Sequence, residues 1–302
     1  MLNLRTSLIA VAAFATVAVP AALAHRMWML PSSTVVSGED NWVTVDAAVS
    51  NDLFFFDHRP ISAIPVITQP DGTAGKVENH AVGQFRGTFD VHLTQQGTFR
   101  IAIVNEGLFG SYKLGGETRM IPRGTTAATL AAAIPAGATD VQTVTNSSRN
   151  EIFVTQGAPT NTVFKTTGSG IELVPVTHPN DLVTDEPATF QFLLDGKPGA
   201  GLTVTVIPGG IRYRNALKGT VLKTDANGKV VIKWGDPGMY WVNVSQGGER
   251  PEGGMGGQAG PGGPGAQGGQ GGPGAEGAPR QRPAGPPQRR VSYVTTLEVL
   301  AP

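Results

Sequence analysis

The histidines carry the clearest chemistry in this sequence, because the chain has five of them and no cysteine. His25 follows Ala22-Leu23-Ala24, so cleavage after Ala24 would leave His25 as the first residue. Its α-amine and its ring nitrogen Nδ1 can then chelate one metal ion, and such nitrogen ligands suit copper, nickel or zinc. The sequence therefore predicts an N-terminal transition-metal ligand in the processed chain.

A second ligand is expected from His58, which lies in the segment NDLFFFDHRP, residues 51–60. Aromatic residues give way here to a short polar cluster, and a proline then ends the extended segment. Loops at the rim of a rigid scaffold are usual places for ligands. Asp57 either binds the metal or orients a neighbouring imidazole. The alternative is a surface ion-pair cluster formed by Asp57, His58 and Arg59.

The other three histidines have weaker signals. His80 lies in a polar stretch, and His92 shares a strand face with polar residues by alternation. His178, in the segment THPND, falls at the junction of the two halves of the chain, where it either joins the site or fixes a turn. We include His178 among the expected metal ligands, with His25, His58 and Asp57.

Residues 1–24 have the three parts of an export signal. Arg5 supplies the positive charge, residues 8–19 the apolar stretch, and the alanines at 22 and 24 the cleavage pattern. An uncleaved anchor is the alternative, but the apolar run is shorter than the roughly 20 residues of a spanning helix. We therefore expect a soluble protein in the bacterial periplasm.

The composition excludes several classes of partner and cofactor. The chain has 23 basic and 23 acidic residues, which gives no electrostatic basis for binding nucleic acid. Without cysteine there can be neither disulfides nor thiolate metal ligands, so a packed core must provide the stability. The sequence also lacks the G-x-S-x-G, H-E-x-x-H, phosphate-loop and dinucleotide motifs.

Alternation of apolar and polar residues in short runs between turn residues predicts an all-β fold. Only the alanine-rich segment 126–133 resembles a short helix. The expected strands lie at residues 42–49, 85–93, 98–104, 170–176, 188–194, 202–207, 230–234, 239–244 and 291–300. We expect two immunoglobulin-like or transthyretin-like β-sandwiches in tandem, at residues 25–167 and 168–302.

Residues 247–290 interrupt this pattern with glycine, proline, glutamine and arginine. Such a composition cannot bury enough apolar surface to fold, so we expect a disordered insert. Because strand-like alternation resumes at Val291, the insert is predicted to lie in the hairpin between the last two strands of the second sandwich.

Three segments carry a resemblance to a known family. They are HRMWMLPSS from residue 25, VDAAVSNDLFFFDH from residue 45, and ELVPVTHPND from residue 172 followed by DGKP at 195–198. The chain resembles the exported bacterial family catalogued as domain of unknown function 4198, formerly grouped with periplasmic components of nickel and cobalt uptake systems. The resemblance implies periplasmic location and a metal-related role, with His25, His58 and His178 at the matching positions.

These observations favour a metal-binding protein over an enzyme. We expect a protein that binds nickel, cobalt or copper for uptake, delivery or buffering, with an inner-membrane metal permease as its partner. One alternative is a copper-dependent polysaccharide monooxygenase-like enzyme, because such enzymes also place an N-terminal histidine and a second histidine on a sandwich. Another is a metal-free envelope binding or scaffold protein.

Overall fold

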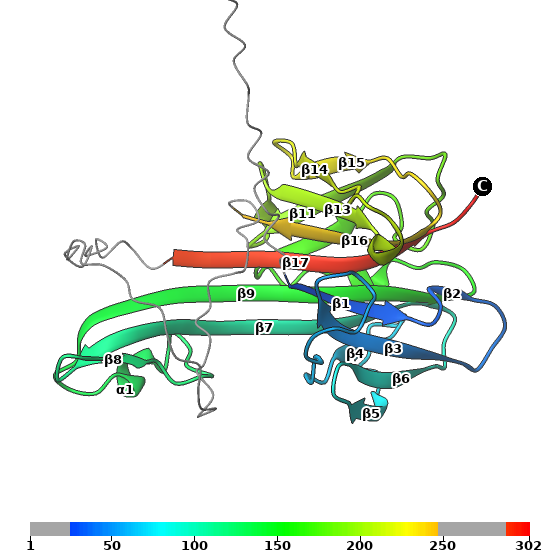
Figure 1. Cartoon of the computed structure of the whole chain (residues 1–302). Helices are drawn as coiled ribbons and strands as arrows, with labels where there is room; N and C mark the ends of the chain where they lie inside the picture. Colours follow the sequence, from blue (N-terminus) through cyan, green and yellow to red (C-terminus); the bar gives the residue numbers. More distant parts are fainter. Residues whose placement is uncertain (1–24, 247–287) are drawn as a thin grey trace, which may run out of the picture.

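The computed structural model describes residues 25–246 and 288–302, which fold almost entirely into β-strands (Figure 1). The predicted export signal, residues 1–24, and nearly all of the predicted disordered insert lie outside the described residues. The one short α-helix of the described chain, α1 (Leu130–Ala133), falls within the alanine-rich segment. The prediction of an all-β sandwich fold is confirmed. No helix in the described ranges is long and apolar enough to cross a bilayer.

One nine-stranded sheet runs through the whole molecule. Its main order is β14 (Thr220–Lys223), β13 (Thr203–Pro208), β16 (Gly238–Ser245), β17 (Gln288–Val299), β9 (Thr139–Gln156), β7 (Gly97–Leu114) and β4 (Val66–Thr68); β2 (Val35–Val36) adds to β9 and β8 (Glu117–Met120) to β7. β17 pairs in parallel with β9, with Val291 opposite Ser147. Figure 1 shows β17 in red lying along β9. This pairing joins the two halves of the chain in one sheet.

The first sandwich closes when a four-stranded sheet packs against the β9–β7–β4 end of the central sheet. That sheet has the order β1 (Arg26–Pro31), β3 (Asn41–Ser50), β6 (Gly87–Leu93) and β5 (Glu78–Val82). In β6, every second side chain is buried, as Phe89, Val91 and Leu93 show. They pack with Phe99 and Ile101 of β7 in one core, and each fully buried apolar side chain contributes roughly 1.5–3 kcal/mol.

The second sandwich covers the other end of the central sheet. Its outer sheet holds β10 (Ile171–Pro175), β11 (Ala188–Leu194), β12 (Lys197–Pro198) and β15 (Lys229–Ile232). Phe190 and Phe192 of this sheet pack against Val242 and Tyr293 of the central sheet. Phe153 of β9 belongs to the same core. The boundary predicted between residues 167 and 168 therefore separates two segments that share a sheet and a core.

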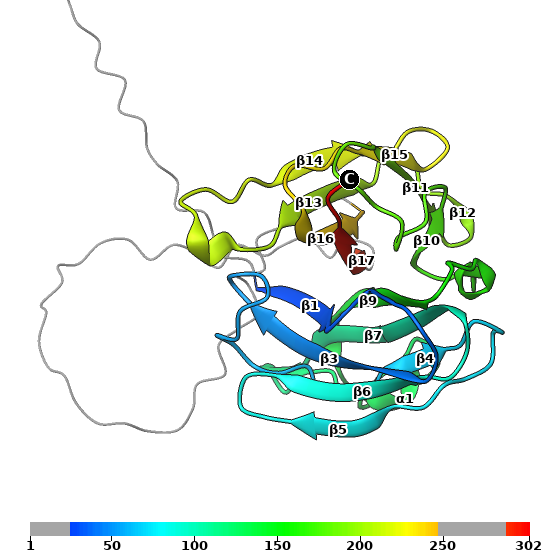
Figure 2. The same cartoon turned by 90° about the vertical axis from the view of Figure 1, so that its right-hand side faces the viewer.

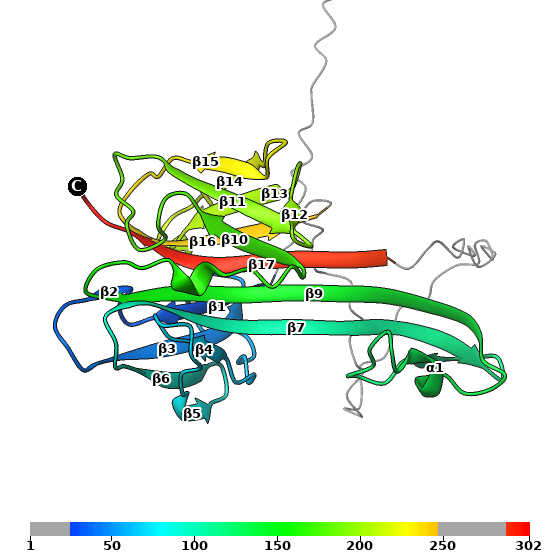
Figure 3. The same ribbon diagram turned by 180° about the vertical axis from the view of Figure 1, so that it is seen from behind.

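Strands β7 and β9 extend past the first sandwich as a long two-stranded arm, which Figure 3 shows from behind with α1 at its end. Alternation in the sequence predicted only residues 98–104 of β7. A small core at the tip holds Leu108, Tyr112 and Ile121. At the other end of the chain, β16 and β17 form the predicted antiparallel pair on either side of residues 247–287.

A separate apolar cluster lies between the two sandwiches, which Figure 2 shows one above the other. Its buried members are Trp28, Ala48, Leu53, Ile207 and Trp241. Trp28 and Ala48 lie opposite each other on β1 and β3, whereas Ile207 and Trp241 come from β13 and β16. The cluster thus fixes the beginning of β1 and the end of β3 against the second half of the chain.

Candidate metal site at the rim of the first sheet

His25 directly precedes β1, and its side chain is exposed. The antiparallel pairing of β1 with β3 places Arg26 opposite Ser50, at the end of β3. The Arg26 guanidinium donates a hydrogen bond to the Asn51 carbonyl at 2.7 Å, from Nη1 to oxygen. The start of β1 is therefore attached to the loop that carries His58.

His58 approaches His25 from this loop. The centroids of the two imidazole rings are 4.2 Å apart, and the ring planes are inclined by 51°. The backbone N–H of Val49 and the carbonyl of Arg59 form a hydrogen bond that returns the chain beside β3. The structure therefore brings together the two histidines that the sequence predicts to lie in one site.

Asp57 lies against the ring of His58. Its Oδ1 is 2.7 Å from Nδ1 of His58, and the same oxygen accepts a hydrogen bond from the Asn51 backbone N–H at 3.3 Å. A carboxylate at Nδ1 favours the tautomer with a proton there, and this leaves the Nε2 lone pair for a ligand. Asp57 thus has the geometry of an orienting partner, and its direct ligation remains a prediction.

The loop that carries His58 has a constrained backbone. Phe54 has φ 64°, in the left-handed region that a bulky residue rarely adopts. Its ring meets the Trp28 indole edge-on, with centroids 5.5 Å apart. On the other side it lies against Gly209, where a Cβ atom would come within 3.0 Å of the Phe54 ring and of the Met239 carbonyl. Packing from both halves therefore holds Phe54 in this conformation.

Two arginines cover the aromatic residues next to Asp57. The Arg212 guanidinium lies 3.8 Å from the Phe55 ring centroid, and that of Arg86 lies 4.8 Å from the Phe56 ring centroid. Such cation–π contacts are worth about 0.5–1 kcal/mol at exposed sites. They hold the polar end of the loop at the rim. No local sequence signal marks Gly209, Arg212 or Trp241, because their roles depend on how the halves pack.

His178 lies elsewhere, beside Thr98 and Thr155 near the β2 end of the first sandwich. Its Nδ1 accepts a hydrogen bond from the Asn180 N–H at 3.1 Å, and its Nε2 is 3.3 Å from the Thr160 carbonyl and 3.1 Å from Thr98 Oγ1. With both nitrogens bonded inside the protein, His178 has the geometry of a structural residue. We therefore leave it out of the proposed metal site.

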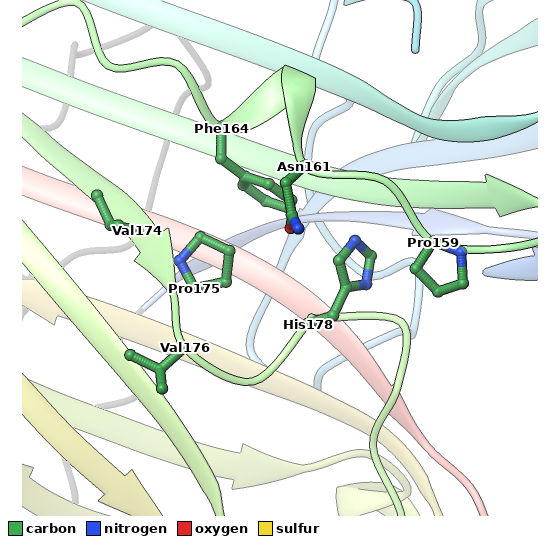
Figure 4. Close-up of a pocket in the computed structure, with 7 residues that line it drawn as sticks. All are labelled: Pro159, Asn161, Phe164, Val174, Pro175, Val176 and His178. Atoms are coloured by element: carbon green, nitrogen blue, oxygen red, sulfur yellow. The ribbon is translucent and has the colours of Figure 1, made fainter.

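His178 also borders the pocket in Figure 4, which has a volume of about 390 Å³. The other lining residues are Pro159, Asn161, Phe164, Val174, Pro175 and Val176. Burial lowers the pKa of His178 below its ordinary value of 6.5, against the opposing effects of the Thr160 carbonyl and of Asp181. Only a neutral ring has a lone pair on Nδ1 that can accept the hydrogen bond from the Asn180 N–H.

The two remaining histidines are on the other two strands of the first sheet, β5 and β6. His80 is half-buried on the edge strand β5, and His92 of β6 stacks on Trp42 of β3. The described residues contain no cluster of three or more His, Asp or Glu side chains arranged to hold a metal. The candidate site therefore has two imidazoles, and its third nitrogen would be the α-amine of a processed chain.

The fold and this rim define a protein of two β-sandwiches on one shared sheet, with a histidine pair where β1 begins. A family model matches residues 22–248, and the chain belongs to that family, described as Domain of unknown function (DUF4198). This confirms the family resemblance noted in the sequence. A search of curated proteins finds no match.

Three solved structures resemble the chain weakly. A DUF4785 family protein from Legionella pneumophila has 8% identity over 72% of this chain and 50% of its own, with a TM-score of 0.22. The human OSCAR ligand-binding domain has 12% identity over 74% and 92%, with a TM-score of 0.17. An ICAM-5 D1–D4 ectodomain fragment has 12% identity over 73% and 45%, with a TM-score of 0.18. The chain spans half the length of the Legionella protein, and similarities this weak carry no argument about function.

Proposed function

We propose that the processed chain is an exported protein that binds a transition metal, nickel, cobalt or copper, for uptake, delivery or buffering. The 4.2 Å separation of the His25 and His58 ring centroids is the observation that carries this proposal. Two imidazoles so close repel each other when both are protonated, whereas a metal ion shared by their neutral forms favours the same arrangement.

The ligand set is the α-amine and Nδ1 of His25 with Nε2 of His58. Asp57 positions the second ring through Nδ1 and strengthens Nε2 as a ligand. Because these nitrogens must lose protons before they bind, affinity should fall as pH falls. The side chain of His58 is 29% exposed and His25 lies at the surface, so an inner-membrane permease has direct access to the ion.

The decisive experiment is a titration of nickel, cobalt and copper into the mature chain, its N-terminus verified by mass spectrometry. Two altered proteins are titrated in parallel, one with an alanine added before His25 and one with His58→Ala. We expect the metal affinity of each altered protein to fall by more than roughly 10–100-fold, which is the loss expected when a residue that only orients a ligand is removed. His80→Ala, on the far edge of the same sheet, is the control and should bind normally.

Equal affinities with and without the added alanine would remove the amine from the site. If the mature chain binds no metal at micromolar concentration, the metal-free envelope scaffold becomes the preferred function. The copper-dependent polysaccharide monooxygenase-like alternative would require a sugar-binding face beside the histidine pair. The exposed indole of the first sheet, Trp42, is instead at the start of β3, whereas the pair lies beyond its end.

A further inference from the structure

A loop of the second half presents exposed aromatic and basic side chains. This loop, residues 209–219, joins β13 to β14 and contains the 3-10 helix η2 (Ile211–Tyr213). Figure 2 shows η2 as the yellow-green turn at the edge of the molecule. Tyr213 is 87% exposed, more than any other large apolar or aromatic side chain of the described residues, and Leu217 is also exposed. The loop therefore displays apolar surface that nothing in the described chain covers.

Hydrogen bonds from Arg214 fix the shape of this loop. Its Nε donates to the Ala216 carbonyl, and its Nη1 donates to the Gly209 carbonyl. Its Nη2 donates to the carbonyls of Pro208 and Leu217. One half-buried guanidinium thus ties both ends of the loop together. A surface that binds here would not have to order a mobile segment first.

The loop lies at the same rim as the histidine pair. Ile211 packs against the apolar cluster between the sandwiches, and Gly209 lies against the Phe54 ring. The Arg212 guanidinium lies 3.8 Å from the ring centroid of Phe55, three residues before His58 in the chain. Whatever the loop binds is therefore brought close to the candidate metal site.

Positive charge is concentrated in and around the loop. Residues 208–224 contain no acidic residue and four basic ones, Arg212, Arg214, Lys218 and Lys223, although the whole chain has equal numbers of both kinds. Arg212 and the exposed Arg59, next to His58, make no ion pair with the described residues. Lys218 lies 3.8 Å from Asp236, and both side chains are largely exposed. This part of the rim therefore suits an anionic partner.

We infer that the loop docks the protein on an anionic phospholipid bilayer. Tyr213 and Leu217 would lie among the headgroups, where a ring with a polar tip is favoured, and Arg212 and Lys218 would face the phosphates. A cation near such a surface strengthens binding about fivefold. A rigid, protruding loop fits a flat and deformable charged surface, whereas a protein partner would need a matching groove.

Docking in this way would hold the histidine pair at the membrane surface, where an inner-membrane permease could receive the ion. That consequence rests on the proposed metal-binding function, but the docking itself needs no metal. The test therefore uses metal-free protein, and His58→Ala should bind vesicles as tightly as the unaltered chain. Loss of metal binding and loss of membrane binding are then separate results.

The test is flotation of the mature, full-length chain with vesicles of mixed phosphatidylcholine and phosphatidylglycerol, and with vesicles of phosphatidylcholine alone. We expect binding to the anionic vesicles only. It should weaken strongly in 1 M salt, where charges are screened beyond about 3 Å. Equal binding to both kinds of vesicle, or to neither, would overturn the inference.

Two double variants remove the same number of charges from different places. Arg212→Gln with Lys218→Gln should weaken binding to the anionic vesicles about 25-fold. Lys113→Gln with Arg119→Gln, two exposed positions on the arm formed by β7, β8 and β9, is the matched control and should bind normally. Equal losses in the two would show that only the overall charge matters, and the docking loop would be rejected.

A label shows which side chain enters the headgroups. Because the chain has no cysteine, Tyr213→Cys and the control Thr118→Cys can each carry one environment-sensitive fluorophore. We expect a blue shift on anionic vesicles at position 213 and none at position 118, which is exposed on the arm. A shift at both positions or at neither contradicts the inference. If the chain ignores vesicles but binds polyglutamate through Arg212 and Lys218, the loop is a protein-docking surface instead.

Discussion

The indole N–H of Trp241 donates a hydrogen bond to the backbone carbonyl of Met27, with 2.9 Å between nitrogen and oxygen. Trp241 belongs to β16 in the second half, and Met27 lies two residues after His25. The same indole is buried in the cluster between the sandwiches. The second half of the chain therefore helps to hold β1 in place. Because His25 directly precedes β1, the geometry of the histidine pair depends on the packing of both halves.

Asp57→Ala should weaken metal binding by about 10–100-fold while the fold is retained, because it frees the His58 ring to rotate and removes the partner of Nδ1. Competition with a chromogenic chelator measures the affinity, and circular dichroism the fold. Asp185→Ala, an exposed aspartate in the second half, is the control. An unchanged affinity would show that Asp57 neither binds the metal nor orients the ring.

Gly209→Ala should destabilise the protein and weaken metal binding together. The added methyl group would meet the Phe54 ring and the Met239 carbonyl at 3.0 Å, and the carbonyl belongs to a paired strand that cannot easily move. Such overpacking costs roughly 1–3 kcal/mol. Urea unfolding and metal titration test this prediction. Gly235→Ala is the control, because an added Cβ atom would have its nearest contact there at 3.6 Å. Gly201→Ala is unsuitable, because Gly201 has φ 71°.

The free energy of unfolding should fall as the pH falls below about 6.5, in part because of His178. Burial lowers the pKa of this ring in the folded protein, so the unfolded chain binds more protons in this range. Protonation would also remove the acceptor for the Asn180 N–H. In His178→Asn, the amide oxygen replaces Nδ1 as acceptor without titrating near neutral pH.

The His178→Asn variant should be less stable than the unaltered protein at pH 8, by about 1 kcal/mol, because it loses the hydrogen bonds at Nε2. Between pH 8 and pH 5 its stability should decline less steeply. Urea unfolding at several pH values gives both quantities. Parallel declines in the two proteins would show that His178 does not contribute to the pH dependence.

Arg149→Met should lower the free energy of unfolding by about 3–5 kcal/mol, because it leaves buried carboxylates without their cation. The guanidinium lies 2.9 Å from Glu151 and 3.6 Å from Glu172, and all three side chains are less than 10% exposed. Arg119→Met breaks the exposed pair with Glu117 and should cost less than about 1 kcal/mol. Similar losses of unfolding free energy in the two variants would contradict this account.

The sequence by itself determined many of the strands and turns, although it did not indicate β1, β5 or the long β9. Alternation in β3, β6 and β11 reflects burial of one face of each strand, and the turn at 224–229 contains Gly228 at φ 74°. These signals are local, because side-chain direction has a period of two and certain turns require particular residues. Local signals also identified His25 and His58 as chemically distinctive.

Only the tertiary structure decided how strands far apart in the chain pair and which histidines meet. The parallel pairing of β17 with β9 and the long arm of β7 and β9 leave no local pattern, because a strand's partner depends on distant residues. His178 was an expected metal ligand like His58, but the fold places it beside Thr98 and Asn180, where both ring nitrogens are bonded. A residue type gives a side chain its chemistry, and packing between segments far apart in the chain determines which partner it meets.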